Sequence, residues 1–260
     1  IGTLLSVAVA GFIAGPGIGA WLAEIGGIET PYLVIAVLLS VTAVPALVWL
    51  RSAPIATSEQ MDVGAMFALL SRPRVRLAVA CQIAVFFNIG VFDSTADKYL
   101  TSLGLSNVGV GWVLVIIAAP LLVLPRIAGR LVDRAPYPGR LLLAATAVLV
   151  PVVLTMGVWE ALVVFTALAV VETTMESFIF PAAARVVVNE TGARESSTGQ
   201  GLLDVAGQSA GAVAAIVAPT MFDLAGGPLG SFGLSGAVAL VFVLYGWILI
   251  RHSARPLAIA

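Results

Sequence analysis

Residues 141–158 read LLLAATAVLVPVVLTMGV and contain no charged side chain. The hydrocarbon core of a bilayer is about 30 Å thick, and a helix needs about 20 mostly apolar residues to cross it. A stretch of this length and composition is therefore typical of a membrane-spanning helix. A transmembrane β-strand is shorter, about ten residues, and alternates between apolar and polar side chains, which this stretch does not.

Seven other stretches of the chain have the same character, so that eight spans are predicted in all. With 141–158, they are residues 1–22, 31–50, 77–96, 108–125, 161–182, 201–222 and 230–250. The composition agrees, because 60% of the residues are hydrophobic and 10% are charged, whereas a soluble domain has about 25% charged residues. We therefore predict an all-α, multi-pass integral membrane protein with eight transmembrane helices.

The basic residues predict the orientation of these helices, because cytoplasmic loops are enriched in Lys and Arg. Of the 13 basic residues, 12 lie in alternate connections or after the last helix: Arg51, Arg72, Arg74, Arg76, Arg126, Arg130, Arg134, Arg140, Arg185, Arg194, Arg251 and Arg255. Only Lys98 lies on the other side, where we expect a solvated pair with Asp97. This pattern places both termini in the cytoplasm.

The longest polar stretch, residues 51–76, reads as a cytoplasmic linker between two groups of helices. It separates two helices, within residues 1–50, from six helices, within residues 77–260. Six helices after a cytoplasmic linker are the organisation of one half of a transporter built from two six-helix halves. No basic stripe lies on a soluble surface, so nothing indicates a nucleic-acid partner.

The first predicted helix contains the run GFIAGPGIGA at residues 11–20. Gly11, Gly15 and Gly19 are four residues apart, so they share one face and would let another helix approach closely. Pro16 removes a backbone donor and bends the helix there. An isolated G-x-x-x-G is usually an ordinary helix interface, but the added Gly-Pro makes this run more specific.

This run resembles the fifth-helix motif G-x-x-x-G-P-x-x-G-G of the major facilitator superfamily, in its proton-coupled drug antiporters. Gly11, Gly15, Pro16 and Gly19 match the motif, and Ala20 replaces its last glycine. The resemblance implies a major-facilitator-like bundle in which the eight spans correspond to helices five to twelve. It makes residues 1–50 the last two helices of the N-terminal half and implies that four preceding helices of the same protein are missing.

A second run, GRLVDR at residues 129–134 followed by Gly139 and Arg140, resembles the superfamily's cytoplasmic motif G-x-L-A-D-R-x-G-R-K. The resemblance implies a cytoplasmic gate formed by Gly129, Asp133, Arg134, Gly139 and Arg140. Asp133 would face the positive end of a neighbouring helix, and the arginines would bridge carboxylates or lipid phosphates. The sequence PYP at 136–138 is an insertion relative to the motif. Arg126 and Arg140 also fit a simple positive-inside bias.

Glu172 and Glu176 lie within one predicted span, where an ionisable residue indicates function by default. They are four residues apart and so share a face, and two carboxylates that close in a poorly solvated site would not both be ionised. A proton-coupling site requires such a pair, although a structural contact with a water-filled cavity would also place glutamates there. No basic residue lies in a neighbouring span, which favours a protonated carboxyl or a cationic substrate.

Two further pairs are candidates for the same proton or substrate site. Asp204 and Gln208 share a face of the 201–222 helix and could line the same cavity, and Asn88 and Asp93 lie in the 77–96 helix. No metal site is expected. The single Cys81 and the single His252 offer no catalytic constellation, so we do not expect an enzyme.

The leading hypothesis is secondary active transport: proton-coupled efflux of a small amphipathic or cationic compound by alternating access, in the plasma (inner) membrane. The proton gradient is then the energy source, and no cofactor is needed. One alternative is a metabolite or sugar facilitator or symporter of the same superfamily. Another is a truncated chain, and we expect residues 1–260 alone, without the missing helices, not to transport.

Overall fold

The computed structural model describes residues 2–50 and 63–253, and every regular element among them is a helix. The chain divides into two compact units. Unit 1 comprises Ile1–Asp62 and Leu105–Val115, and unit 2 comprises Val63–Gly104 and Ile116–Ala260. Helix α5 (Asn107–Ala118) therefore begins in unit 1 and ends in unit 2.

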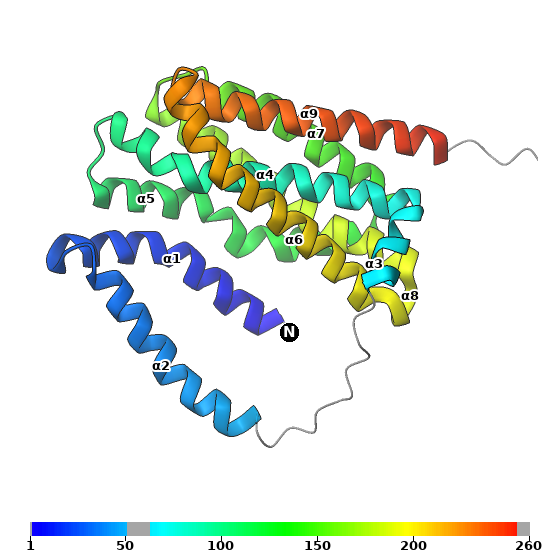
Figure 1. The fold of residues 1–260 in the computed structure, drawn as a ribbon, viewed down its shortest axis with the longest axis horizontal. Helices are drawn as coiled ribbons and strands as arrows, with labels where there is room; N and C mark the ends of the chain where they lie inside the picture. The colour runs from blue at the N-terminus through cyan, green and yellow to red at the C-terminus, as the bar shows by residue number, and fades with distance from the viewer. Residues whose placement is uncertain (1, 51–62, 254–260) are drawn as a thin grey trace, which may run out of the picture. The chain divides into compact units, whose positions relative to one another are not determined.

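Unit 1 contains α1 (Gly2–Gly26), α2 (Thr30–Leu50) and most of α5 (Figure 1). Gly27 makes the turn between α1 and α2 with a φ of +87°, a conformation that favours glycine. Its N–H closes the last turn of α1 on the Ala23 carbonyl at 2.9 Å. The two apolar segments Ala14–Gly26 and Thr30–Pro45 are bent by 120° relative to each other.

Gly17 and Gly111 lie at a close contact between α1 and α5. A methyl group on Gly17 would lie 3.1 Å from Val115 Cγ2, and one on Gly111 would lie 2.9 Å from the Pro16 carbonyl oxygen. The expected face is different: around Gly11, Gly15 and Gly19 no other described atom lies within 4 Å of such a methyl group. Among the described residues, α1 therefore packs against α5 through Gly17, which is not one of the three glycines spaced by four. The role of the face formed by Gly11, Gly15 and Gly19 stays a prediction.

Unit 2 is built around α4 (Pro73–Ser102), most of whose side chains are buried. It also contains a short helix, α3 (Val63–Ala68), a 3₁₀ turn, η1 (Leu69–Ser71), and four longer helices. These are α6 (Pro120–Arg134), α7 (Pro138–Met156), α8 (Leu162–Leu224) and α9 (Pro228–Ser253). Apolar side chains of α4, α7, α8 and α9, among them Leu77, Leu142 and Ile179, form one core.

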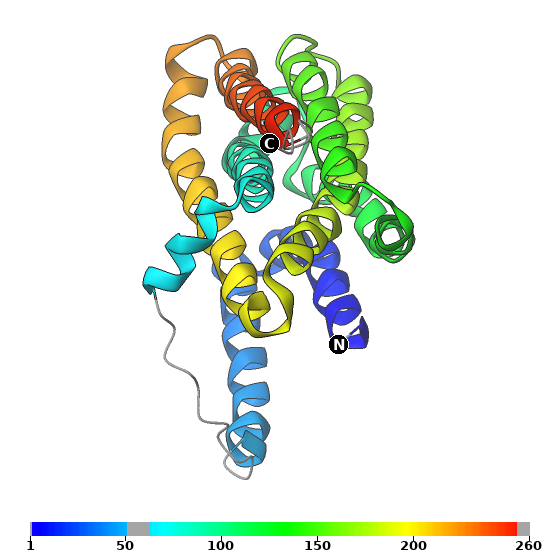
Figure 2. The same cartoon turned by 90° about the vertical axis from the view of Figure 1, so that its right-hand side faces the viewer.

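Helix α8 is two helices that meet at Gly192. Gly192 has φ +68° and ψ −175°, a region that essentially only glycine adopts. The halves run in opposite directions from this point (Figure 2), and the Gln200 side chain donates to the Ala184 carbonyl at 3.3 Å across them. The sequence predicts two spans here, 161–182 and 201–222, and two candidate spans are present, Leu162–Gly192 and Glu195–Leu224.

Helices α7 and α9 lie side by side and antiparallel (Figures 1 and 2). Gly246, near the end of α9, faces Leu143, near the start of α7; further along the pair, Gly236 faces Leu154. In both cases the missing side chain of a glycine lets a leucine of the other helix fit closely. The pair therefore stays in contact over most of its length.

Six described helices are long and apolar enough to cross a membrane, or up to seven if the bent pair of α1 and α2 counts as one span. The six match the six predicted after residue 76. One of them, Asn107–Arg134, comprises α5 and α6, which are separated where Pro120 lacks an N–H. The total of eight spans and the cytoplasmic termini stay predictions, and the linker 51–76 lies outside the described residues up to residue 62.

Candidate functional site

A chain of buried hydrogen bonds joins α9, α4 and α8 in the middle of unit 2. The Ser235 hydroxyl donates to the side-chain oxygen of Asn88 at 2.9 Å, and the Asn88 amide donates to Glu172 Oε1. Asn88 is 1% exposed, Glu172 is 3% exposed and Ser235 is fully buried. The structure thus brings together two predicted site residues, Glu172 and Asn88, that lie on different helices.

The second carboxyl oxygen of Glu172, Oε2, is buried and has no hydrogen-bond partner among the described residues. An ionised carboxylate in apolar surroundings is very costly unless it is paired. The free oxygen can be satisfied in two ways, by a proton of its own or by a cation that enters the site. Both are reversible, which makes this carboxyl suitable for a coupling role.

Glu176 and Asp93 place two further carboxyl groups near Glu172. Glu176 is 5% exposed, and Glu172 and Asp93 both act on it electrostatically. Asp93 acts on Glu172 as well, but its own side chain is exposed. Three of the predicted acidic residues therefore form one acidic cluster, with Glu172 and Glu176 on α8 and Asp93 on α4.

Aromatic side chains fill the bundle on one side of the cluster. Phe165 stacks on Phe92 and meets Tyr99 and Phe232 edge to face, with ring centroids 4.9 to 6.0 Å apart. Phe165 precedes Glu172 by seven residues, which is about 10 Å along a helix. Tyr99, Phe165 and Phe232 are almost completely buried. They lie toward the end of unit 2 that contains Trp159, whose carbonyl accepts a hydrogen bond from Tyr99.

Asp204 and Gln208 are not joined to the Glu172 cluster. Both side chains are exposed, and neither forms a hydrogen bond or an ion pair with another described residue. Their neighbour Gly207 packs against the ring of Phe86, which in turn contacts Phe180. Their contribution to a shared cavity stays a prediction.

Ser235 is a site residue that the sequence analysis did not identify. A serine in an apolar helix is a weak signal, because its hydroxyl usually bonds a carbonyl one turn earlier. Thr173 was missed for the same reason. Its hydroxyl lies 3.1 Å from the Ala169 carbonyl of its own helix, but it also donates at 2.7 Å to the Ile117 carbonyl, beside the break between α5 and α6.

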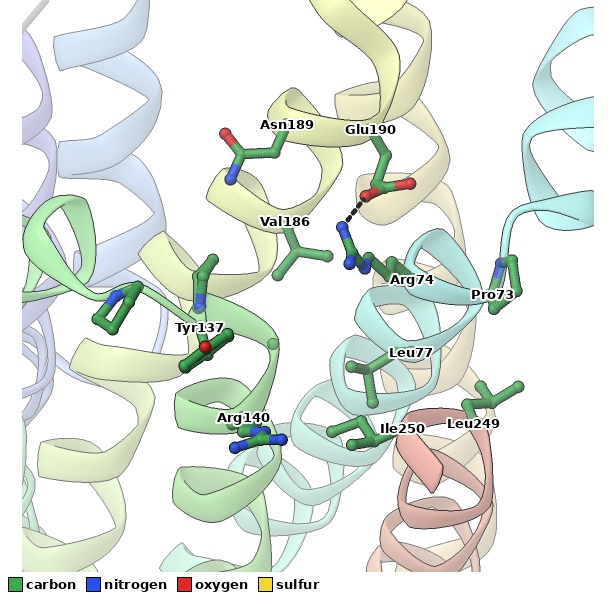
Figure 3. A pocket seen from close by; sticks show the side chains of 13 residues that line it. Pro73, Arg74, Leu77, Tyr137, Arg140, Val186, Asn189, Glu190, Leu249 and Ile250 are labelled. Carbon is green, nitrogen blue, oxygen red and sulfur yellow. Dashed lines mark hydrogen bonds and ion pairs between the residues drawn. The ribbon is translucent and has the colours of Figure 1, made fainter. Parts of the chain in front are cut away.

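The residues of the predicted gate lie at the end of unit 2 where α6 ends and α7 begins. Asp133 Oδ1 lies 3.9 Å from Arg185 Nε, and both side chains are exposed, so this pair is worth little in free energy. A methyl group on Gly139 would lie 3.2 Å from Leu77. The Arg140 guanidinium lies over the Tyr137 ring at 4.8 Å (Figure 3). Gly129 and Arg134 make no specific contact with another described residue, and a gate stays a prediction.

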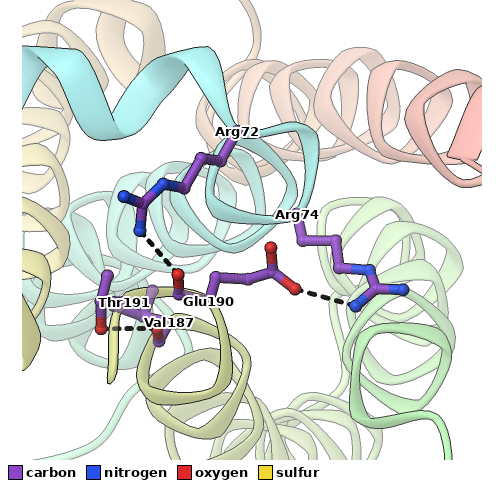
Figure 4. Close-up of polar contacts among 5 residues, drawn as sticks. All are labelled: Arg72, Arg74, Val187, Glu190 and Thr191. Atoms are coloured by element: carbon purple, nitrogen blue, oxygen red, sulfur yellow. Dashed lines mark hydrogen bonds and ion pairs between the residues drawn. The ribbon is translucent and has the colours of Figure 1, made fainter. Parts of the chain in front are cut away.

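Ion pairs tie the start of α4 to the turn within α8. Arg74 pairs with the Glu190 carboxylate at 2.8 Å, and Arg72 donates to the Glu190 backbone carbonyl at 2.6 Å (Figure 4). Arg72 also pairs with Glu195 at 2.8 Å. We call this end of unit 2, which contains Arg72, Arg74, Arg140 and Arg251, the arginine-rich end.

At the opposite end, Lys98 pairs with Asp223 and lies 5.0 Å from the ring of Phe222. The prediction that Lys98 pairs with Asp97 is therefore wrong. Successive residues of a helix point in different directions, so Asp97 does not face Lys98, whereas Asp223 at the end of α8 lies within reach of it.

No group of three or more His, Cys, Asp or Glu side chains within residues 2–50 and 63–253 is arranged to hold a metal ion. In the comparisons with known proteins, residues 1–212 and 78–259 match the family model described as Major Facilitator Superfamily. No curated protein matches the chain at a significant level.

Proposed function

The chain belongs to the major facilitator superfamily of secondary transporters, and we propose that it couples the efflux of a small amphipathic or cationic compound to proton entry. Alternating access in the plasma (inner) membrane would expose the acidic cluster to each side in turn. The observation that carries the proposal is Glu172 Oε2, a buried carboxyl oxygen without a partner.

Proton coupling is supported by the direction of the hydrogen bonds at this site. Ser235 donates to Asn88, and Asn88 donates to Glu172 Oε1, so one carboxyl oxygen is occupied by a donor. Only Oε2 is free to gain and lose a proton. A carboxyl held in one orientation with one free oxygen presents a single exchange position to whichever side is open.

A cationic substrate is supported by the charge balance. Asp93, Glu172 and Glu176 act on one another electrostatically. The described ion pairs of unit 2 all lie toward its ends and none includes these three carboxylates. A cation that enters the cluster would replace the proton as the partner of Glu172, so proton and substrate would compete for it. Such competition is the simplest basis for antiport.

Export is supported by the resemblance of Gly11, Gly15, Pro16 and Gly19 to the antiporter motif. In a symporter, protonation of the same buried carboxyl would favour substrate binding instead of opposing it, because proton and substrate would then bind together. The direction of flux relative to the proton gradient therefore separates the two functions.

The test is transport of ethidium, a lipophilic cation, in inverted membrane vesicles that contain the full-length gene product. We expect an imposed pH gradient, acid inside, to drive ethidium into the vesicles. Glu172→Gln should abolish this gradient-driven uptake, because the amide cannot exchange a proton, while ethidium exchange without a gradient continues. The control is Glu160→Gln, the same change at an exposed residue.

Equal loss in Glu160→Gln, or gradient-driven uptake that survives Glu172→Gln, would overturn the coupling role of Glu172. Substrate movement in the same direction as the proton would replace antiport by symport.

A further inference from the structure

Two adjoining cavities lie at the arginine-rich end of unit 2. The first has a volume of about 490 Å³ and is lined by the start of α4, the α6–α7 connection, α8 before Gly192 and the end of α9 (Figure 3). The second has a volume of about 580 Å³ and runs between α7 and α9. Arg140 and Ile250 line both, so the two cavities meet at these two side chains.

The second cavity is an apolar groove. Ala144 and Ala147 form part of its wall on α7, and Val243, Leu244 and Trp247 form part of it on α9. The alanines are three residues apart and so lie on one face of α7, and their small side chains leave the space open. Leu244 and Trp247 are about half exposed. Because α7 and α9 are both candidate membrane spans, this groove opens toward lipid.

The first cavity has a mixed lining that carries excess positive charge, with two arginines and one glutamate. Arg74 and Arg140 line it, but Arg74 is already paired with Glu190. Arg140 has no carboxylate partner among the described residues and lies over the ring of Tyr137. Arg251 lines neither cavity, but it follows Ile250 and lies 3.5 Å from the ring of Trp247, which lines the groove. It has no carboxylate partner among the described residues either. A guanidinium on a ring face keeps its N–H edge free for an oxygen ligand.

We propose that the two cavities together bind one anionic phospholipid. Its phosphodiester lies against Arg140, where the two cavities meet, and Arg251, on Trp247 of the groove wall, adds a second positive charge. Its headgroup enters the first cavity, and one acyl chain follows the groove between α7 and α9. Basic pockets between the ends of membrane helices suit anionic headgroups, and the apolar groove suits a hydrocarbon chain. A free phosphate would leave the groove empty, and a zwitterionic lipid would leave the extra positive charge without a partner.

The inserted sequence PYP at 136–138 takes part in this site. Pro136, Tyr137 and Pro138 all line the first cavity, and Tyr137 supports the Arg140 guanidinium. The insertion therefore forms one wall of the headgroup cavity, between the end of α6 and the start of α7. This gives the departure from the family spacing a physical role that is independent of proton coupling.

The test is thermal unfolding of the complete protein in detergent, with short-chain phosphatidylglycerol titrated against short-chain phosphatidylcholine. A ligand that binds the folded state raises the unfolding temperature in a saturable way. We expect phosphatidylglycerol to do so, with at most a small effect of phosphatidylcholine. The double variant Arg140→Gln/Arg251→Gln should weaken phosphatidylglycerol binding about thirtyfold, because each arginine near an anionic lipid contributes about one kcal/mol.

Two further variants test the acyl-chain groove and control for the loss of positive charge. Ala144→Leu fills the groove without changing any charge and should also weaken phosphatidylglycerol binding. Arg126→Gln removes an exposed arginine of α6 that neither lines a cavity nor adjoins a lining residue in the sequence, and it should leave binding unchanged. Inorganic phosphate alone should give no stabilisation.

Equal stabilisation by the two lipids would overturn the proposal. So would full stabilisation by phosphate alone, unchanged binding in Ala144→Leu, or the same loss in Arg126→Gln as in the double variant.

Discussion

The Ser235 hydroxyl on α9 lies 2.9 Å from the side-chain oxygen of Asn88 on α4 and donates to it. A hydroxyl donor on this oxygen orients the Asn88 amide with its nitrogen toward Glu172. The orientation of the carboxyl on α8 therefore depends on a serine of another helix. The bond also joins three helices through side chains that are almost completely buried.

Ser235→Ala should destabilise the protein by about 1–3 kcal/mol, because it leaves the buried oxygen of Asn88 without a donor. Thermal unfolding in detergent measures the change. Ser231→Ala is the matched control: Ser231 is also fully buried on α9, but its hydroxyl contacts the Pro228 carbonyl of its own helix at 3.3 Å. An equal loss of stability in both variants would show that the hydrogen bond from Ser235 to Asn88 does not stabilise the protein more than the bond within α9.

Asn88→Leu should destabilise more than Ser235→Ala, because it leaves the Glu172 carboxyl and the Ser235 hydroxyl both without their partner. Replacing both members of a buried polar pair by apolar residues is much less costly than replacing one. The double variant Asn88→Leu/Glu172→Leu should therefore unfold at a higher temperature than the sum of the single changes predicts. A double-mutant cycle measures this coupling, and simple additivity would contradict a direct bond.

Gly111→Ala should destabilise the packing of α1 against α5. Its methyl group would lie 2.9 Å from both the Pro16 carbonyl oxygen and Ala20 Cβ, and overpacking of this kind costs about 1–3 kcal/mol. Gly11→Ala is the control, because no other described atom lies within 4 Å of its methyl group and alanine favours a helix. The unfolding temperatures of the two variants measure the difference. A larger loss of stability in Gly11→Ala would indicate that α1 packs through the face formed by Gly11, Gly15 and Gly19.

Gly192→Ala should disturb the turn that divides α8. The combination of φ +68° and ψ −175° costs about 1–3 kcal/mol for a residue with a side chain. Gly201→Ala, nine residues later within the second half of α8, has open space around the new methyl group and should be neutral or slightly stabilising. Thermal unfolding of the pair measures the difference. A neutral Gly192→Ala would mean that the halves of α8 meet in another conformation.

Much of the helical architecture could be predicted from the sequence, because hydrocarbon imposes a length and a composition on each span. The six predicted spans after residue 76 all correspond to candidate spans. The position of the turn at Gly192 could not be predicted in this way. It lies in a polar stretch of the sequence, and the first half of α8 could have ended at any of several residues there. Likewise, Pro120 divides one predicted span into two helices without ending it as a span.

Glu172 could be identified from the sequence for a similar reason: a carboxyl among apolar residues is costly at any helix rotation. Its partners could not. Thr95, Thr146 and Ser177 all bond a carbonyl one turn earlier in their own helix, and Ser235, which bonds Asn88 instead, looks the same as these residues in the sequence. Only the contact between helices distinguishes them.

The sequence by itself thus determined that the chain is helical and apolar enough for a membrane, that acidic residues lie inside it, and that basic residues gather at one end of its helices. These properties depend on composition and on spacing along one helix. The tertiary structure decided that Gly17 and not Gly15 meets Gly111, that Ser235 reaches Asn88, that Lys98 pairs with Asp223, and that Arg140 lies between two cavities. These contacts depend on how each helix is rotated against its neighbours, and that rotation is set by side-chain packing across the bundle.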